Sequence, residues 1–163
     1  MRPCFRTVTA VLLFAVCGFA TGQSKTEVSL QKERSNLARE SDPVDRTKIQ
    51  IKIAEFLITL LTDAARSGND KLVEQHLNDY SNTIQDAQLT MMKTGKDAHK
   101  HPAGFKDLEI ALRKQQRRLS DAGKLLDYDQ REPIDRVRKL ASDIGDQLVK
   151  IMLLKEPNAS SKP

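Results

Sequence analysis

The sequence predicts an all-α protein, folded as an antiparallel up-down four-helix bundle. The composition favours helices, because 30% of the 163 residues are charged and only 4% are aromatic, whereas sheets draw on aromatic and β-branched residues. Four segments carry apolar residues three and four positions apart, which places them on one helix face. Short connectors favour antiparallel neighbours. The same apolar faces would also suit two long helical hairpins that dimerise, so this alternative stays open.

Residues 1–22 have the layout of a secretory signal peptide. Arg2 and Arg6 precede an uncharged run from Thr7 to Ala20, and the small residues of Ala20-Thr21-Gly22 suit a signal peptidase. The run is shorter than the roughly 20 residues that span a bilayer. We therefore expect cleavage after Gly22 and a periplasmic or secreted protein. It would touch a membrane only through this segment, if the segment stays uncleaved.

Cleavage would change the chemistry that the chain can perform. Residues 1–22 contain two arginines, no acid and both cysteines, so the formal net charge would fall from +5 to +3 and no thiol would remain. A disulfide or a thiolate metal site is then excluded. Residues 23–41 are polar, and their few apolar residues share no helical face. This pattern predicts a polar linker or a weak helix.

The expected bundle domain spans residues 42–154, and its first helix runs from Pro43 to about Ser67. Asp42 is a suitable N-terminal cap, and proline suits the first helical position. Besides its main apolar stripe, this helix carries a second one formed by Ile51, Ile58 and Ala65. Two stripes require more than one neighbour. We expect the second stripe to be the interface for a protein partner or a second copy of the chain.

Three further helices follow the same logic. Gly68 ends the first helix, and a heptad seam typical of coiled coils runs from Val73 to Met91. Pro102 is expected to open the third helix, whose seam contains one polar member, Gln115. We expect Gln115 to be buried, to fix the register, and to bond to His76 or Tyr80. The fourth helix follows a capping-box pattern at residues 129–132, and residues 155–163 are expected to be a disordered tail.

The sequence carries none of the common catalytic motifs. The sequence contains no nucleophile-elbow, dinucleotide-binding, P-loop, zinc-protease or haem-attachment motif. No helix carries the Glu-x-x-His pair of di-iron bundles. The carboxylates fall on polar faces, where no pair is set apart for acid–base work. We therefore expect a non-enzymatic protein without a cofactor.

One candidate metal site lies in the second connector. Asp97, His99 and His101 alternate there, and an extended segment would offer one carboxylate and two imidazoles to copper or zinc. The simpler interpretation is a polar loop with a helix cap in front of Pro102. A metal site would also need a further ligand and groups that orient the imidazoles.

The other candidate site is basic and lies on the last two helices. Cationic side chains there could bind a polyanion such as polyphosphate, a lipid headgroup surface or nucleic acid. The chain is expected to be exported and lacks aromatic stacking platforms, so we expect no nucleic acid. Acids lie between the cations, which also suits an ordinary solvated face. The candidate residues are Arg113, Arg117, Arg118, Arg136 and Lys139.

Two resemblances add to this interpretation. The segment from His101 to Leu119 resembles a helix of the CHAD family of polyphosphate-binding bundles. The longer stretch HPAGFKDLEIALRKQQRRLSD, with the basic helix after it, is similar to small exported proteins of soil Acidobacteria. The second resemblance implies a location in the bacterial envelope or outside the cell, and it implies no activity. The expected function is therefore a protein-interaction or structural module of the cell envelope, with polyanion binding or metal binding as alternatives.

Overall fold

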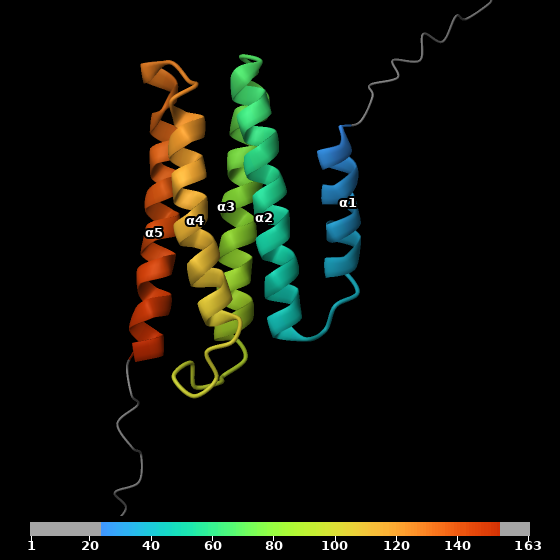
Figure 1. Ribbon diagram of the computed structural model, residues 1–163, viewed down its shortest axis with the longest axis vertical. Coiled ribbons are helices and arrows are strands. Elements are labelled where there is room, and N and C mark those ends of the chain that lie inside the picture. Colours follow the sequence, from blue (N-terminus) through green and yellow to red (C-terminus); the bar gives the residue numbers. More distant parts are fainter. Residues whose placement is uncertain (1–23, 154–163) are drawn as a thin grey trace, which may run out of the picture.

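The computed structural model describes residues 24–153, which form five α-helices and one short 3-10 helix (Figure 1). No strand occurs in this part of the chain, so the prediction of an all-α protein is confirmed. The expected count of four helices is not confirmed, because the segment before Pro43, expected to be a polar linker or a weak helix, contains a helix of its own. The predicted signal peptide (1–22) and tail (155–163) lie outside the described residues.

The additional helix, α1 (Lys25–Leu37), is fixed by its cap and by a few contacts. The Ser24 hydroxyl accepts from the Glu27 backbone N–H at 3.2 Å, and the Glu27 carboxylate accepts from the Ser24 N–H at 2.7 Å. This is a capping box. Only Leu30 is buried. α1 packs against α2 and forms an ion pair with α3 between Arg34 and Asp79, at 3.0 Å.

The long helix α2 (Pro43–Arg66) lies at the centre of the helix contacts. It starts as expected, with the Asp42 carboxylate accepting from the N–H groups of Val44 and Asp45 at 2.9 and 3.0 Å. It then contacts α1, α3 (Asp70–Met92) and α4 (Phe105–Gly123). Three neighbours account for an apolar surface wider than one stripe.

The remaining helices form two hairpins that stack on each other. α2 packs with α3, and α4 packs with α5 (Glu132–Leu153), which follows the short helix η1 (Tyr128–Gln130). The chain runs alternately up and down through α2 to α5 (Figure 1). The hairpins meet where α2 contacts α4 and α3 contacts α5. The successive helices α3 and α4 therefore lie diagonally opposite each other and have only slight contact.

The connector of residues 93–104 makes this diagonal crossing and determines where α4 begins. Gly104 has φ +79°, and a Cβ on it would lie 2.7 Å from the Met91 sulfur. Only glycine suits both the backbone angle and the close approach. α4 therefore begins at Phe105, after the turn, and not at the expected Pro102.

A buried polar pair joins the two diagonal helices inside the core. The Tyr80 hydroxyl donates to Gln115 Oε1 at 3.0 Å, and both side chains are at most 1% exposed. Burial raises the pKa of the Tyr80 hydroxyl. The expectation that Gln115 is buried and bonded to Tyr80 or His76 is confirmed for Tyr80.

Candidate functional site

The apolar stripe expected to be an interface is used inside the chain. Ile58 is fully buried, Ala65 is 5% exposed, and Ile51 is half-buried. Ile58 lies one helical turn from Glu55, which forms an ion pair with Lys114 of α4 at 3.7 Å. The Ile58 face therefore turns toward α4. The expectation of a free interface at this stripe is wrong, because the second neighbour that the stripe requires is another helix of the same chain.

The predicted metal ligands are not brought together. The Asp97 carboxylate accepts from the His99 backbone N–H at 2.9 Å and pairs with Lys100 at 3.4 Å. Burial alone would raise the pKa of Asp97, but these hydrogen bonds outweigh it and lower the pKa. His99 Nδ1 contacts the Met152 carbonyl oxygen at 3.1 Å, and His101 is exposed. Among residues 24–153, no three His, Cys, Asp or Glu side chains are placed to bind a metal ion.

The basic residues gather along the seam between α4 and α5. Three open hollows follow this seam, with volumes of about 460, 390 and 220 Å³. We call them together the basic groove. Six cationic side chains and three carboxylates line it. The cationic side chains are Arg113, Arg117, Lys124, Arg131, Arg138 and Lys139.

Arg138 occupies the centre of the basic groove, since it lines all three hollows. Its Nη1 donates to Asp135 at 2.8 Å, and its side chain is 41% exposed. Its Nε is buried and has no hydrogen-bond partner among the described residues. A buried donor without a partner is unfavourable, but a ligand in the groove reaches this N–H only if the guanidinium shifts.

Three other cations of the groove form ion pairs within or next to their own helix. Arg113 pairs with Glu109, Lys124 with Asp121 at 2.7 Å, and Lys139 with Asp143 at 3.0 Å. The cationic side chains of these pairs are more than 70% exposed. Surface pairs contribute about 0–1 kcal/mol, so an anionic ligand can replace Asp121 and Asp143 at little cost. Glu109 is only 11% exposed, and taking Arg113 away from it would leave a buried carboxylate unpaired.

Two of the predicted basic residues lie elsewhere. Arg118 turns toward α2, where its Nη2 donates to the Thr59 hydroxyl at 2.9 Å. Arg136 pairs with Glu132 at 2.7 Å and lines none of the hollows of the basic groove. Arg113 and Arg117 of α4 and Lys139 of α5 do lie in the groove, as predicted together, and each lines a hollow that Arg138 also lines.

The five candidate residues did not include Lys124, Arg131 and Arg138, although the sequence carried a signal for them. On α4 and just beyond it, Arg113, Arg117, Ser120 and Lys124 step by four, three and four residues. Before and along α5, Arg131, Asp135, Arg138 and Ser142 do the same. Each polar stripe flanks an apolar seam. The short connector already predicted that these two helices are neighbours, so the two stripes could have been paired from the sequence.

The comparisons with known proteins assign no family to this chain. No helix among the described residues is both long and apolar enough to cross a membrane. Comparisons with protein-family models, curated proteins and solved structures give no match. The resemblances noted in the sequence therefore rest on the quoted residues alone.

Proposed function

We propose that this protein is an exported, non-enzymatic helical domain that binds a linear polyanion in the basic groove. The observation that carries the proposal is Arg138, which lines all three hollows and holds a buried Nε donor without a partner. A guanidinium with free donors in a groove suits a phosphate or sulfate group, which offers several acceptor oxygens.

The shape of the basic groove favours a chain of anions over a single one. From Arg113 to Lys124 the groove follows 11 residues of α4 and its end, which corresponds to about 16 Å at 1.5 Å per residue. Cations from α5 line the opposite side. An extended ligand with regularly spaced negative charges can therefore contact several cations at once. Inorganic polyphosphate is the simplest such ligand and the probe for the test.

The test compares groove variants with matched variants outside the groove. Arg138→Gln and Arg117→Gln should each weaken polyphosphate binding about fivefold to tenfold, as expected for the loss of one charge-assisted hydrogen bond at a partly exposed site. Arg136→Gln and Arg118→Gln remove the same charge from the same helices outside the groove, and binding should change less than about twofold. Titration calorimetry at two salt concentrations measures this, because phosphate contacts make affinity salt-dependent.

Equal weakening by all four variants would show that only net charge matters, and it would contradict the groove. Absence of binding by the unaltered protein at low salt would contradict the proposal as a whole. Heparin serves as a second probe, because it carries sulfates in place of phosphates and distinguishes the ligand class.

Export of the protein from the cytoplasm is part of the same proposal. The basic n-region and apolar run of residues 1–22 support export, and mass spectrometry of the protein from its host should give Gln23 as the first residue. An N-terminus at Met1 would contradict cleavage.

We further propose that α2–α5 form a four-helix bundle to which α1 is appended. A chain that starts at Ser41 should keep a cooperative unfolding transition, and a non-cooperative one would contradict this division.

Docking of a protein partner is a second candidate function, supported by exposed apolar side chains at the end that carries η1. Tyr128 is 85% exposed, Leu125 is 45% exposed and Leu72 is 39% exposed. Gln130 donates to Asp70 at 2.8 Å, which places η1 beside the start of α3. Aromatic side chains are enriched among residues that dominate binding. Cross-linking in cells should give a partner adduct that Tyr128→Ala abolishes, and an unchanged adduct would exclude this end.

A further inference from the structure

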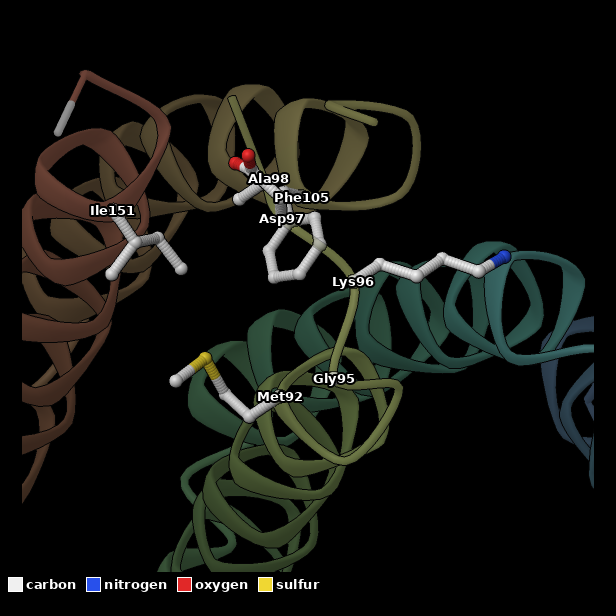
Figure 2. A pocket seen from close by; sticks show the side chains of 7 residues that line it. All are labelled: Met92, Gly95, Lys96, Asp97, Ala98, Phe105 and Ile151. Atoms are coloured by element: carbon white, nitrogen blue, oxygen red, sulfur yellow. The ribbon is translucent and has the colours of Figure 1, made fainter. Parts of the chain in front are cut away.

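A further hollow, outside the basic groove, lies at the opposite end of the molecule from η1. Its chemistry differs from that of the groove. It lies between the end of α3, the connector and the end of α5, and has a volume of about 360 Å³. We call it the connector hollow (Figure 2). Its size falls in the lower part of the range for small-molecule sites. It is lined by Met92, Gly95, Lys96, Asp97, Ala98, Phe105 and Ile151.

Four of the seven residues that line the connector hollow carry apolar side chains. In Figure 2 the side chains of Met92 and Ile151 face each other across the space, and the ring of Phe105 closes a third side. Phe105 is 2% exposed and Ala98 is 7% exposed, so both belong to the packed core. Met92, in contrast, is 50% exposed. An apolar chain that covers Met92 would remove its side chain from water, which is favourable in proportion to the area buried.

The connector hollow is held in shape without a ligand. His99 Nδ1 lies 3.1 Å from the Met152 carbonyl oxygen and so ties the connector to the end of α5. The Asp97 carboxylate caps the His99 N–H, which fixes the turn. Gly95 contributes a left-handed turn with φ +62°. These contacts give Asp97 and His99 a structural role in the place where a metal site was expected.

Two charged residues line the connector hollow, Lys96 and Asp97. Residues 93–106 contain four lysines against the single carboxylate of Asp97, and that carboxylate is already engaged by Lys100 and a backbone N–H. Lys96 lines the hollow, but its side chain extends away from the apolar walls in Figure 2. Its flexible four-carbon stem lets the ammonium reach a ligand at the mouth. Because Lys100 already balances Asp97, the Lys96 ammonium is left to pair with a ligand, and an apolar hollow with one such ammonium beside it is complementary to an anionic amphiphile.

We propose that the connector hollow binds a single-chain anionic amphiphile, with its hydrocarbon chain between Met92, Phe105 and Ile151 and its headgroup near Lys96. This site is separate from the basic groove, so either proposal stands if the other fails. Dodecanoate is the probe, used below the concentration at which it forms micelles.

The experiment titrates the purified protein with dodecanoate by calorimetry and compares two matched variants. Met92→Gln replaces an apolar wall by a polar side chain of similar length and should weaken binding about fivefold. Leu89→Gln alters an equally exposed residue, 50%, on the same helix that does not line the hollow, and it should change binding less than about twofold. Lys96→Gln should weaken binding about threefold. Circular dichroism of each variant verifies the helical fold.

Dodecyltrimethylammonium has the same chain with a cationic headgroup, and it should bind at least about fivefold more weakly than dodecanoate. Equal binding of the two amphiphiles would overturn the assignment of an anionic headgroup. Equal effects of Met92→Gln and Leu89→Gln would overturn the site. Binding to phosphatidylglycerol vesicles without binding to dodecanoate would overturn the proposal in favour of a membrane surface.

Discussion

The buried pair of Tyr80 and Gln115 allows a quantitative test of how the two hairpins are joined. It connects α3 and α4, which otherwise touch little across the diagonal. Gln115 Nε2 has no hydrogen-bond partner among the described residues, so the amide is only half satisfied. Any change that strands one partner should therefore cost free energy, and a change that removes both should not.

The magnitudes follow from which polar atoms stay buried. Tyr80→Phe leaves both polar atoms of the Gln115 amide without a partner, and it should lower the free energy of unfolding by about 1–3 kcal/mol. Gln115→Leu strands the Tyr80 hydroxyl but removes the amide nitrogen that was already unpaired, so its cost should be smaller, about 1 kcal/mol. The double variant has no stranded polar atom, and its stability should return to within about 1 kcal/mol of the unaltered protein.

Urea unfolding followed by circular dichroism measures all four proteins, and the cycle requires that the m-value stay constant. The cost of the double variant should be clearly less than the sum of the two single costs. If the two costs add, the side chains do not interact, and the placement of α3 and α4 across the diagonal loses its main polar contact. A lower m-value in one variant would instead indicate a loosened native state.

Three further predictions concern the glycines and the one half-buried histidine. Gly104→Ala should lower the thermal unfolding temperature more than Gly95→Ala does. Both glycines have positive φ, but only at Gly104 does the new Cβ collide with Met91. Equal losses of stability would contradict the collision. Gly145→Ala places a methyl in open space on α5 and should raise the free energy of unfolding by about 0.5–1 kcal/mol, so a loss would contradict it. Burial lowers the pKa of His76 below 6.5, so the unfolded chain binds the proton more readily. Stability should therefore fall as the pH drops from about 6.5 through the lowered native pKa, and His76→Gln should flatten this dependence in urea titrations at several pH values.

Local signals in the sequence predicted most helix boundaries. Asp42 and Pro43 marked the start of α2, and Gly68 marked its end, because caps act through atoms within one turn. The same kind of signal at Ser24 and Glu27 was overlooked, and it is the capping box that starts α1. Gly104 shows the limit of such signals. Its role depends on Met91, a core residue whose position is set by packing.

The neighbour of each helix could not be derived from periodicity. A heptad seam states which residues are buried and not which helix covers them. For this reason Ile51 and Ile58 were expected at a free interface, although α4 lies against that side of α2. For the same reason Arg118 was grouped with Arg117, although the two point to different neighbours, α2 and α5. The basic chemistry of the groove was predictable, but the structure was needed to show which cations of α4 and α5 face their common seam.

The most direct test of the basic groove is a nuclear magnetic resonance titration of the protein with inorganic polyphosphate. Backbone amide shifts should change along residues 113–124 of α4 and residues 131–143 at the start of α5, and the side-chain Nε–H signal of Arg138 should move most. Arg138→Gln should reduce these changes, whereas Arg136→Gln should leave them in place. Shifts spread over all basic helices, or confined to α1 and α3, would contradict the account.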